Sequence, residues 1–382
     1  MHPKSNKLKP HSIIILFFCL LLSCQNRQAK PQNPWGDATD EFDLTQIEQA
    51  GELIALTISG PETYYDYKGT KMGVHAMLCQ QFADSLGVRL RIELCRDTAE
   101  MFDRLEDGDG DLISYPLRTP NEVSPGWMIS KEKPDLAEAF LTWYHADRLE
   151  LARAEEQRLL NSGGSIRRKV YAPMQNRAKG IISPYDALFR QHGQKIRWDW
   201  RLLAAQCYQE STFDPNATSW AGARGLMQIM PQTADHLGVA RSELSNPAQN
   251  IAAAARYLVE LEQSFSDIPS RRERQDFVLA AYNGGAHHIR DAMALTRQGG
   301  RDPHRWKEVA HYVLRLREPQ YYQDPVVRYG YMRGNETVEY VELIRQRYAQ
   351  YSGVKSSGNV SSPQKSRNER HRKKYQIKMP EQ

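Results

Sequence analysis

Glu210 is the residue of this sequence whose type and position most readily suggest chemistry. It lies in the segment CYQESTFDPN at 207–216, and the residues before it carry apolar side chains at helical spacing. Pro215 cannot continue a helix, so we expect Glu210 in the last turn. Burial and the partial negative charge of a helix C-terminus both disfavour a carboxylate and raise its pKa, which would suit a general acid. The alternative is a glutamate at a frayed helix end that points into water.

Small and polar residues follow Glu210 in the segment SWAGARGLMQIMP. Gly222 and Gly225 lie among small side chains and permit a close approach of the backbone to a helix or a ligand. Gln228 lies between apolar neighbours, and its amide can donate and accept hydrogen bonds, which suits a sugar hydroxyl or acetamido group. Taken singly, the glycines can also form an ordinary turn and the amide can also cap backbone groups.

Two later helices contribute further polar side chains. AAYNGG places Tyr282 and Asn283 at the end of a predicted helix, just before two glycines. Glu336 and Tyr340 are four residues apart in ETVEYV and therefore share one helix face. A tyrosine such as Tyr282 is also common in protein cores when its hydroxyl has a partner.

The elements that must position these residues divide the chain into two kinds of structure. Strand and helix patterns alternate from 45 to 150, which predicts an α/β domain with a parallel sheet. Residues 151–182 mix long-helix, glycine and basic segments and are predicted to be a linker. From 183 to 351 the patterns are almost wholly helical, and the basic, serine-rich segment 352–382 has little apolar content. The predicted fold class is therefore α+β with several domains.

The charge of +5 does not indicate a nucleic-acid partner. Three positive charges lie in the first nine residues, and the last 31 residues carry a net charge of +6. The body of the chain is therefore slightly acidic, which argues against nucleic acid as the main partner. The acidic segment DGDGD resembles the start of a calcium loop, but Leu112 and Arg118 occupy positions where that loop needs Gly and Glu. We expect no metal and no cofactor.

The N-terminus predicts export and lipid attachment. A basic start precedes an apolar run from Ile13 to Leu22, which is too short for a comfortable membrane span but suits a signal peptide. The run ends in LLSC, which resembles a bacterial lipobox, so 1–23 is predicted to be a lipoprotein signal peptide and Cys24 the lipidated residue. Residues 24–44 then form a tether. A plain signal peptide, or a short anchor with an incidental cysteine, is the alternative.

Three cysteines remain in the body of the chain. A disulfide between Cys79 and Cys95 is possible but is not determined by spacing. Cys207 falls on the apolar helix face and is predicted to be a small buried side chain.

Together the motifs resemble a known family. ES, GxxGLMQIMP and AAYNGG, in this order, resemble the lysozyme-like lytic transglycosylases of glycoside hydrolase family 23, and SPYDALF, YGYMRG and ETVEYV resemble its membrane-bound type F branch. The resemblance covers about 183–351. It implies a lysozyme-like all-α domain that cleaves peptidoglycan between N-acetylmuramic acid and N-acetylglucosamine.

The resemblance assigns roles to individual residues. Glu210 matches the catalytic glutamate. The positions that match residues around the substrate are Ser211, Ser219, Met227, Gln228, Tyr282, Asn283 and Tyr340.

A single catalytic carboxyl group is consistent with the mechanism that the family implies. Most glycosidases use two carboxylates, but Asp214 is expected to accept backbone hydrogen bonds in a turn, and Asp199 suits a helix start. In the implied reaction Glu210 protonates the leaving oxygen and then takes the proton of the C6 hydroxyl of muramic acid. The product is a 1,6-anhydro sugar.

The N-terminal half resembles the other domain of the type F branch, a periplasmic solute-binding fold. TISGPETYYDYKG and DGDLISYPL match its first lobe, whereas the portion that builds the second lobe is missing between about 117 and 126. We therefore expect a truncated, single-lobe domain that exposes half a crevice and acts as a positioning or interaction module, with possible protein partners through 45–150.

Three functions from different classes are consistent with the sequence. The favoured one is a lytic transglycosylase that acts on peptidoglycan glycan strands and is anchored by lipid to a membrane facing the periplasm, with the outer membrane favoured. The others are a muramidase, which is a hydrolase, and a non-catalytic lipoprotein that binds the wall or senses solutes.

Replacement of Cys24 by Ala should release the protein from membranes, because the thiol that would carry the lipid is lost. Fractionation of cells that express the parent or the variant measures this. Equal sedimentation of both proteins with membranes would contradict lipid attachment at Cys24.

Overall fold

The computed structural model describes residues 42–120, 122–162, 174–176 and 179–353. The predicted signal peptide, Cys24, nearly all of the tether and the basic tail lie outside the described residues, as does much of the predicted linker. None of the helices in the described segments is both long and apolar enough to cross a bilayer.

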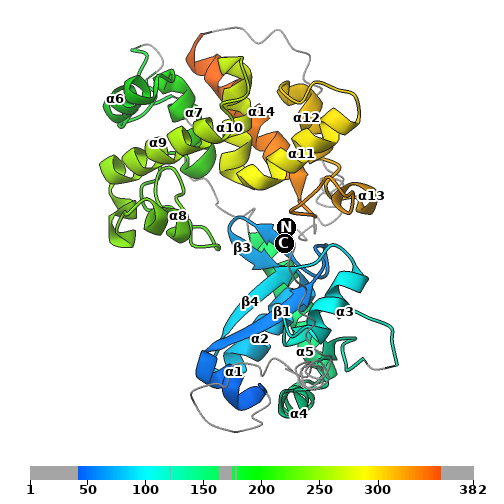
Figure 1. The fold of residues 1–382 in the computed structure, drawn as a ribbon. Helices are drawn as coiled ribbons and strands as arrows, with labels where there is room; N and C mark the ends of the chain where they lie inside the picture. Colours follow the sequence, from blue (N-terminus) through cyan, green and yellow to red (C-terminus); the bar gives the residue numbers. More distant parts are fainter. Residues whose placement is uncertain (1–41, 121, 163–173, 177–178, 354–382) are drawn as a thin grey trace, which may run out of the picture. The chain divides into compact units, whose positions relative to one another are not determined.

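The N-terminal half is built from short strands and helices (Figure 1). Its elements are α1 Leu44–Ala50, β1 Glu52–Thr57, β2 Tyr65–Tyr67, β3 Thr70–Met72, α2 Val74–Ser85, β4 Arg89–Leu94, α3 Thr98–Glu106, β5 Leu112–Ile113, β6 Met128–Ile129, α4 Pro134–Trp143 and α5 Ala146–Ser162. The strand order in the main sheet is β4-β1-β5-β6. β1 runs parallel to β4 and β5, as the alternation of strands and helices predicts, whereas β6 is antiparallel to β5.

The sheet is stabilised by an apolar core that the central strand and α2 share. Leu53 and Ala55 of β1 and Phe82 of α2 are fully buried in it. Trp127 stacks on Phe140 of α4 at 5.1 Å between ring centroids. Large apolar side chains buried in this way are the main favourable contribution to folding.

The segment after the last strand forms two helices. α4 ends at Trp143 because Tyr144 leaves the helical conformation with ψ 128° and stacks its ring on Phe140. α5 then begins at Ala146 and packs against α2.

β2 and β3 form a separate hairpin that the sequence analysis does not predict. They pair antiparallel, with Tyr67 opposite Thr70, so the turn contains only Lys68 and Gly69. Both turn residues have positive φ, 51° and 70°, as a type I′ turn requires. The base of the hairpin is tight, because a Cβ atom on Gly73 would lie 2.6 Å from the carbonyl oxygen of Thr63.

The C-terminal half consists of helices and loops, as predicted. The helices are α6 Asp186–Ile196, α7 Trp200–Ser211, α8 Pro231–His236, a 3-10 helix at Arg241–Ser245, α9 Pro247–Ser264, α10 Arg271–Gly284, α11 Ala286–Gln298, α12 Trp306–Val313, α13 Pro319–Tyr322 and α14 Gly334–Tyr351. Residues 179–353 contain no strand, only isolated bridges.

α7 is the most enclosed helix of this half and carries Glu210 in its last turn. Asp199 caps its start by accepting a hydrogen bond from the backbone N–H of Arg201 at 2.9 Å. α6 and α14 pack against it, and its residues 202–208 are all buried. Cys207 is fully buried, as predicted, and Cys79 and Cys95 are both free thiols.

Asn250 of α9 fixes the loop that follows α7. Its side-chain oxygen accepts from the N–H of Met227 at 2.7 Å, and its amide nitrogen donates to the carbonyls of Arg224 and Leu244, each at 2.9 Å. The backbone of Gly225 lies directly against this amide. A Cβ atom there would be 2.1 Å from the carbonyl oxygen of Leu244.

Gly225→Ala should therefore destabilise the protein more than Gly222→Ala does. Both glycines have positive φ, 79° and 86°, so each alanine costs about 1–2 kcal/mol of backbone strain. Only the alanine at 225 also collides with its surroundings, since the nearest atom to a Cβ at 222 is 3.6 Å away; overpacking of this kind costs roughly 1–3 kcal/mol more. Urea unfolding measures both variants. Equal losses would contradict the packing described for Asn250.

Candidate active site

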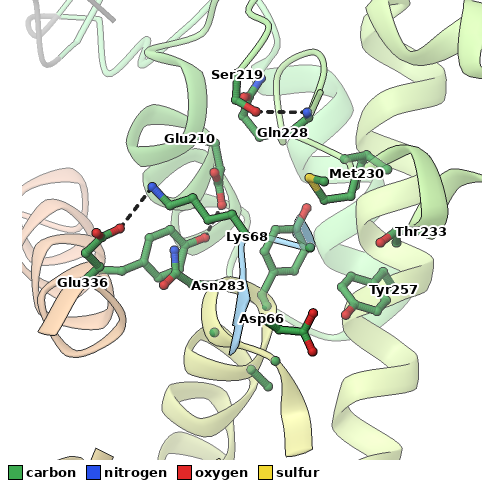
Figure 2. Close-up of a pocket in the computed structure, with 18 of the residues that line it drawn as sticks. Asp66, Lys68, Glu210, Ser219, Gln228, Met230, Thr233, Tyr257, Asn283 and Glu336 are labelled. Atoms are coloured by element: carbon green, nitrogen blue, oxygen red, sulfur yellow. Dashed lines mark hydrogen bonds and ion pairs between the residues drawn. The ribbon is translucent and has the colours of Figure 1, made fainter. Parts of the chain in front are cut away.

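A cavity of about 1170 Å³ lies beside the C-terminus of α7 (Figure 2). Six of the eight residues that the sequence analysis places around a substrate line it, and they come from α7, the following loop, α10 and α14. They are Glu210, Ser219, Gln228, Tyr282, Asn283 and Tyr340.

Glu210 has the properties expected of an acid that keeps its proton near neutral pH. Burial raises its pKa to about 7, although the hydroxyl of Tyr340 and the ammonium of Lys68 both favour the charged form. The Tyr340 hydroxyl donates a hydrogen bond to Oε1 of Glu210. Desolvation is therefore the dominant effect on this carboxyl group, and the side chain still borders the cavity.

The second tyrosine of the site anchors the cavity wall. The hydroxyl of Tyr282 donates to the carbonyl oxygen of Met227 at 2.7 Å. Burial, followed by the nearby Glu210, raises the pKa of Tyr282 far above its ordinary value, so it stays a neutral donor. Its neighbour Asn283 accepts a hydrogen bond from the hydroxyl of Thr337 at 2.8 Å, which joins the end of α10 to α14.

The polar groups of Gln228 and Ser219 are partly used within the loop itself. The amide nitrogen of Gln228 donates to the carbonyls of Ala217 at 3.0 Å and Gly225 at 2.9 Å. The hydroxyl oxygen of Ser219 accepts from the N–H of Ala223 at 3.0 Å. An amide has two N–H donors, so Gln228 can offer the cavity chiefly its acceptor oxygen.

Ser211 and Met227 do not line the cavity, which corrects their predicted placement. Ser211 is 3% exposed, and its hydroxyl donates to the carbonyl oxygen of Leu226 at 2.8 Å. Met227 is 1% exposed and belongs to the helical core. Both residues therefore support the wall from behind. The sequence could not show this, because a side chain in an apolar run next to a motif is as readily turned inward as outward.

Much of the cavity comes from residues that the sequence analysis missed. Lys68 and Gly69 reach it from the β2–β3 hairpin, more than a hundred residues before Glu210. Further members are Asp66, Trp220, Met230, Thr233, Tyr257, His287, His288, Tyr329, Glu339 and Leu343. The signal for the hairpin was the dipeptide Lys68-Gly69 between YDY and TKM, since a glycine in such a pair favours a two-residue turn.

Three other carboxylates near the site, those of Asp214, Asp199 and Glu336, have structural partners. Asp214 accepts from the N–H of Asn216 at 2.9 Å, as a turn residue is predicted to do, and Asp199 caps α7. Glu336 borders the cavity but is bound by Lys68 at 3.0 Å and by the hydroxyl of Tyr67. Among the residues that the structure describes, no group of three or more His, Cys, Asp or Glu side chains could hold a metal ion.

The raised pKa of Glu210 predicts a pH-dependent stability. Between its ordinary pKa of 4.5 and about 7, the folded protein holds a proton that the unfolded chain releases. The free energy of unfolding therefore falls as pH rises through this window, by at most about 3 kcal/mol. Glu210→Gln removes this titration, so its stability relative to the parent should grow from about pH 4 to about pH 8, as urea unfolding measures. Exposed Glu243→Gln is the control, and a gain for Glu210→Gln that is independent of pH would contradict the assignment.

Known proteins match the helical half of the chain. Residues 187–304 match the family described as the transglycosylase SLT domain. The membrane-bound lytic murein transglycosylase F of Ectopseudomonas mendocina is 44% identical over 164 residues, which cover 43% of this chain and 33% of that protein.

Another relative aligns with both halves. The membrane-bound lytic murein transglycosylase F of Citrobacter koseri is 28% identical over 89% of this chain and 86% of its own length. That alignment is 454 positions long, whereas this chain has 382 residues, so the relative contains residues that have no counterpart here.

Solved structures give more distant matches. The 70 kDa soluble lytic transglycosylase of Escherichia coli is 25% identical, with coverage of 45% of this chain and 25% of that chain and a TM-score of 0.33. The arginine-bound form of domain 1 from TmArgBP is 20% identical, with coverage of 28% and 97% and a TM-score of 0.21.

The predicted resemblance is confirmed by the match to the transglycosylase SLT domain and by the two relatives named membrane-bound lytic murein transglycosylase F. The chain carries a transglycosylase SLT domain and is a homologue of the membrane-bound lytic murein transglycosylases F.

Proposed function

We propose that this protein is a peptidoglycan lytic transglycosylase. It cleaves the β-1,4 bond between N-acetylmuramic acid and N-acetylglucosamine without water and leaves a 1,6-anhydro-muramic acid end. The observation that carries the proposal is the half-buried Glu210 carboxyl group, whose desolvation raises its pKa to about 7, at the edge of a large cavity in an SLT domain.

In the first step Glu210 acts as the general acid. Its proton goes to the glycosidic oxygen as the bond from that oxygen to C1 of muramic acid breaks, and N-acetylglucosamine leaves with a free hydroxyl. A pKa near the working pH suits this transfer, because a large fraction of the enzyme then carries the proton.

In the second step Glu210 acts as the base. Its carboxylate takes the proton of the C6 hydroxyl of the same muramic acid, and the C6 oxygen forms a bond to C1. The carboxylic acid is thereby restored for the next cycle. Because the nucleophile belongs to the substrate, no second protein carboxylate is needed and the effective concentration of the nucleophile is high.

Other residues of the cavity have supporting roles in this proposal. Tyr340 orients Glu210 through its hydrogen bond and stabilises the carboxylate formed between the two steps. Tyr282 and Asn283 line the cavity from the end of α10, and Gln228 and Ser219 present acceptor groups to sugar hydroxyl or acetamido N–H groups.

The location of the protein is part of the same proposal. Lipid on Cys24 holds it at a membrane facing the periplasm, with the outer membrane favoured, and residues 24–44 give the body reach toward the wall. The name of the relatives, membrane-bound lytic murein transglycosylase, supports membrane attachment. The proposed domains are the single-lobe domain at 45–150 and the catalytic domain at 183–351. α5 runs past residue 150 to Ser162 and packs against α2, so the first domain extends into the segment predicted as a linker.

Glu210→Gln should abolish cleavage while the protein stays folded and still binds glycan, because the amide keeps the shape of the side chain but cannot donate and recover a proton. Mass spectrometry of digested peptidoglycan measures the products. The parent should release anhydro-muropeptides, which are lighter than hydrolytic products by one water.

Glu243→Gln is the matched control, since it makes the same change on an exposed residue outside the cavity. Near-normal turnover by Glu210→Gln would refute the assignment of the acid. Hydrolytic products from the parent would instead identify a muramidase.

A further inference from the structure

The tip of the β2–β3 hairpin is attached to one wall of the cavity. The ammonium of Lys68 lies 3.0 Å from Oε2 of Glu336, which is in the first turn of α14. The hydroxyl of Tyr67 reaches both carboxylate oxygens of Glu336, at 2.5 and 2.6 Å. Figure 2 shows Lys68 extending past Glu210 toward Glu336.

The same tip also contacts the opposite wall. Gly69 lies against the N-cap residue of α8, since a Cβ atom at this position would be 3.0 Å from Cε of Met230. The ring of Tyr67 stacks on Trp220 in the loop after α7, at 6.0 Å between centroids. Four consecutive positions, counting Asp66, thus border or bridge the cavity between α14 and α8.

The base of the hairpin is held as firmly as its tip. Glu156 of α5 accepts from the Tyr65 hydroxyl and from the N–H of Gly73, both at 3.1 Å. Tyr65 packs edge-on against Tyr331 at 5.0 Å, and the N–H of Tyr331 donates to Ser59 at 2.9 Å. The buried rings and Met72 form a small apolar core of their own.

A bridge fixed at both ends limits how a polymer can enter. A glycan strand is long and carries bulky peptides on its muramic acid residues, so an internal segment cannot settle into a cavity that is bridged from wall to wall. A strand end can enter beneath or beside the bridge without opening it.

We propose that the β2–β3 hairpin is a specificity-determining element that restricts cleavage to the ends of glycan strands. The inference rests on the proposed transglycosylase function and defines its substrate as strand ends. Tyr67 and Lys68 hold the bridge in place by binding Glu336.

The test compares the parent with the double variant Tyr67→Phe, Lys68→Asn. Phenylalanine keeps the stacking on Trp220 but lacks the hydroxyl, and asparagine suits the left-handed turn position but lacks the charge. Lys71→Asn is the matched control, because it removes the same charge from an exposed position of the same hairpin that does not line the cavity.

Each protein is given purified long glycan strands and a short tetrasaccharide with one muramic acid at the cleavable bond. Size-exclusion chromatography at early times measures the lengths of the products. The parent and Lys71→Asn should release short anhydro products from the start, whereas the double variant should produce fragments of intermediate length. Turnover of the tetrasaccharide by the double variant reports the separate effect of losing the Lys68 charge near Glu210, so the lengths of the products from long strands are compared at equal tetrasaccharide turnover.

Intermediate-length fragments from the parent at early times would overturn the proposal, as would an unchanged product pattern from the double variant. An equal rise in rate on both substrates would also overturn it, because the hairpin would then obstruct both substrates alike and would not select strand ends. Hydrolytic products released from strand ends would refute the transglycosylase assignment and still support the restriction to ends.

Discussion

The hydrogen bond from Tyr340 to Glu210 is the interaction on which the site depends. It joins the last turn of α7 to α14, two helices that pack closely, and it gives the half-buried carboxyl group of Glu210 a side-chain donor. Burial opposes the charge of Glu210, and the tyrosine and Lys68 offset part of that penalty. The balance leaves a pKa of about 7, which suits a group that must give up a proton and recover it.

The loop after α7 meets a second constraint, which is the need to pair its backbone groups. The buried amide of Asn250 satisfies two of them, at Met227 and Arg224, and also binds the carbonyl of Leu244 in the 3-10 helix, while Tyr282 satisfies the carbonyl of Met227. These hydrogen bonds hold the loop within the protein itself, and Gln228 and Ser219 of the loop line the cavity. The close approach of Gly225 to Asn250 is the reason that a side chain is excluded there.

The sequence had suggested that the truncated N-terminal half exposes half a crevice. In the structure this half instead contributes residues to the cavity of the catalytic half. Ser59, just beyond the end of β1, accepts a hydrogen bond from Tyr331, and the space beside it is filled by Gly330. The β2–β3 hairpin, which follows Ser59 in the chain, borders the cavity. A sheet edge that would face a ligand in a two-lobed protein therefore packs against the helical half in this chain.

Sequence alone determined the secondary-structure classes of both halves and six of the residues that line the cavity. These depend on local patterns, such as the apolar face that ends at Glu210 and the helix end at Tyr282. Local patterns can be read from the sequence because they involve only residues close together in the chain. Tertiary structure alone decided that Ser211 and Met227 turn inward and that Lys68 lies beside Glu210. The direction in which a side chain points, and its contact with a hairpin more than a hundred residues away, follow from packing between elements, which no periodicity encodes.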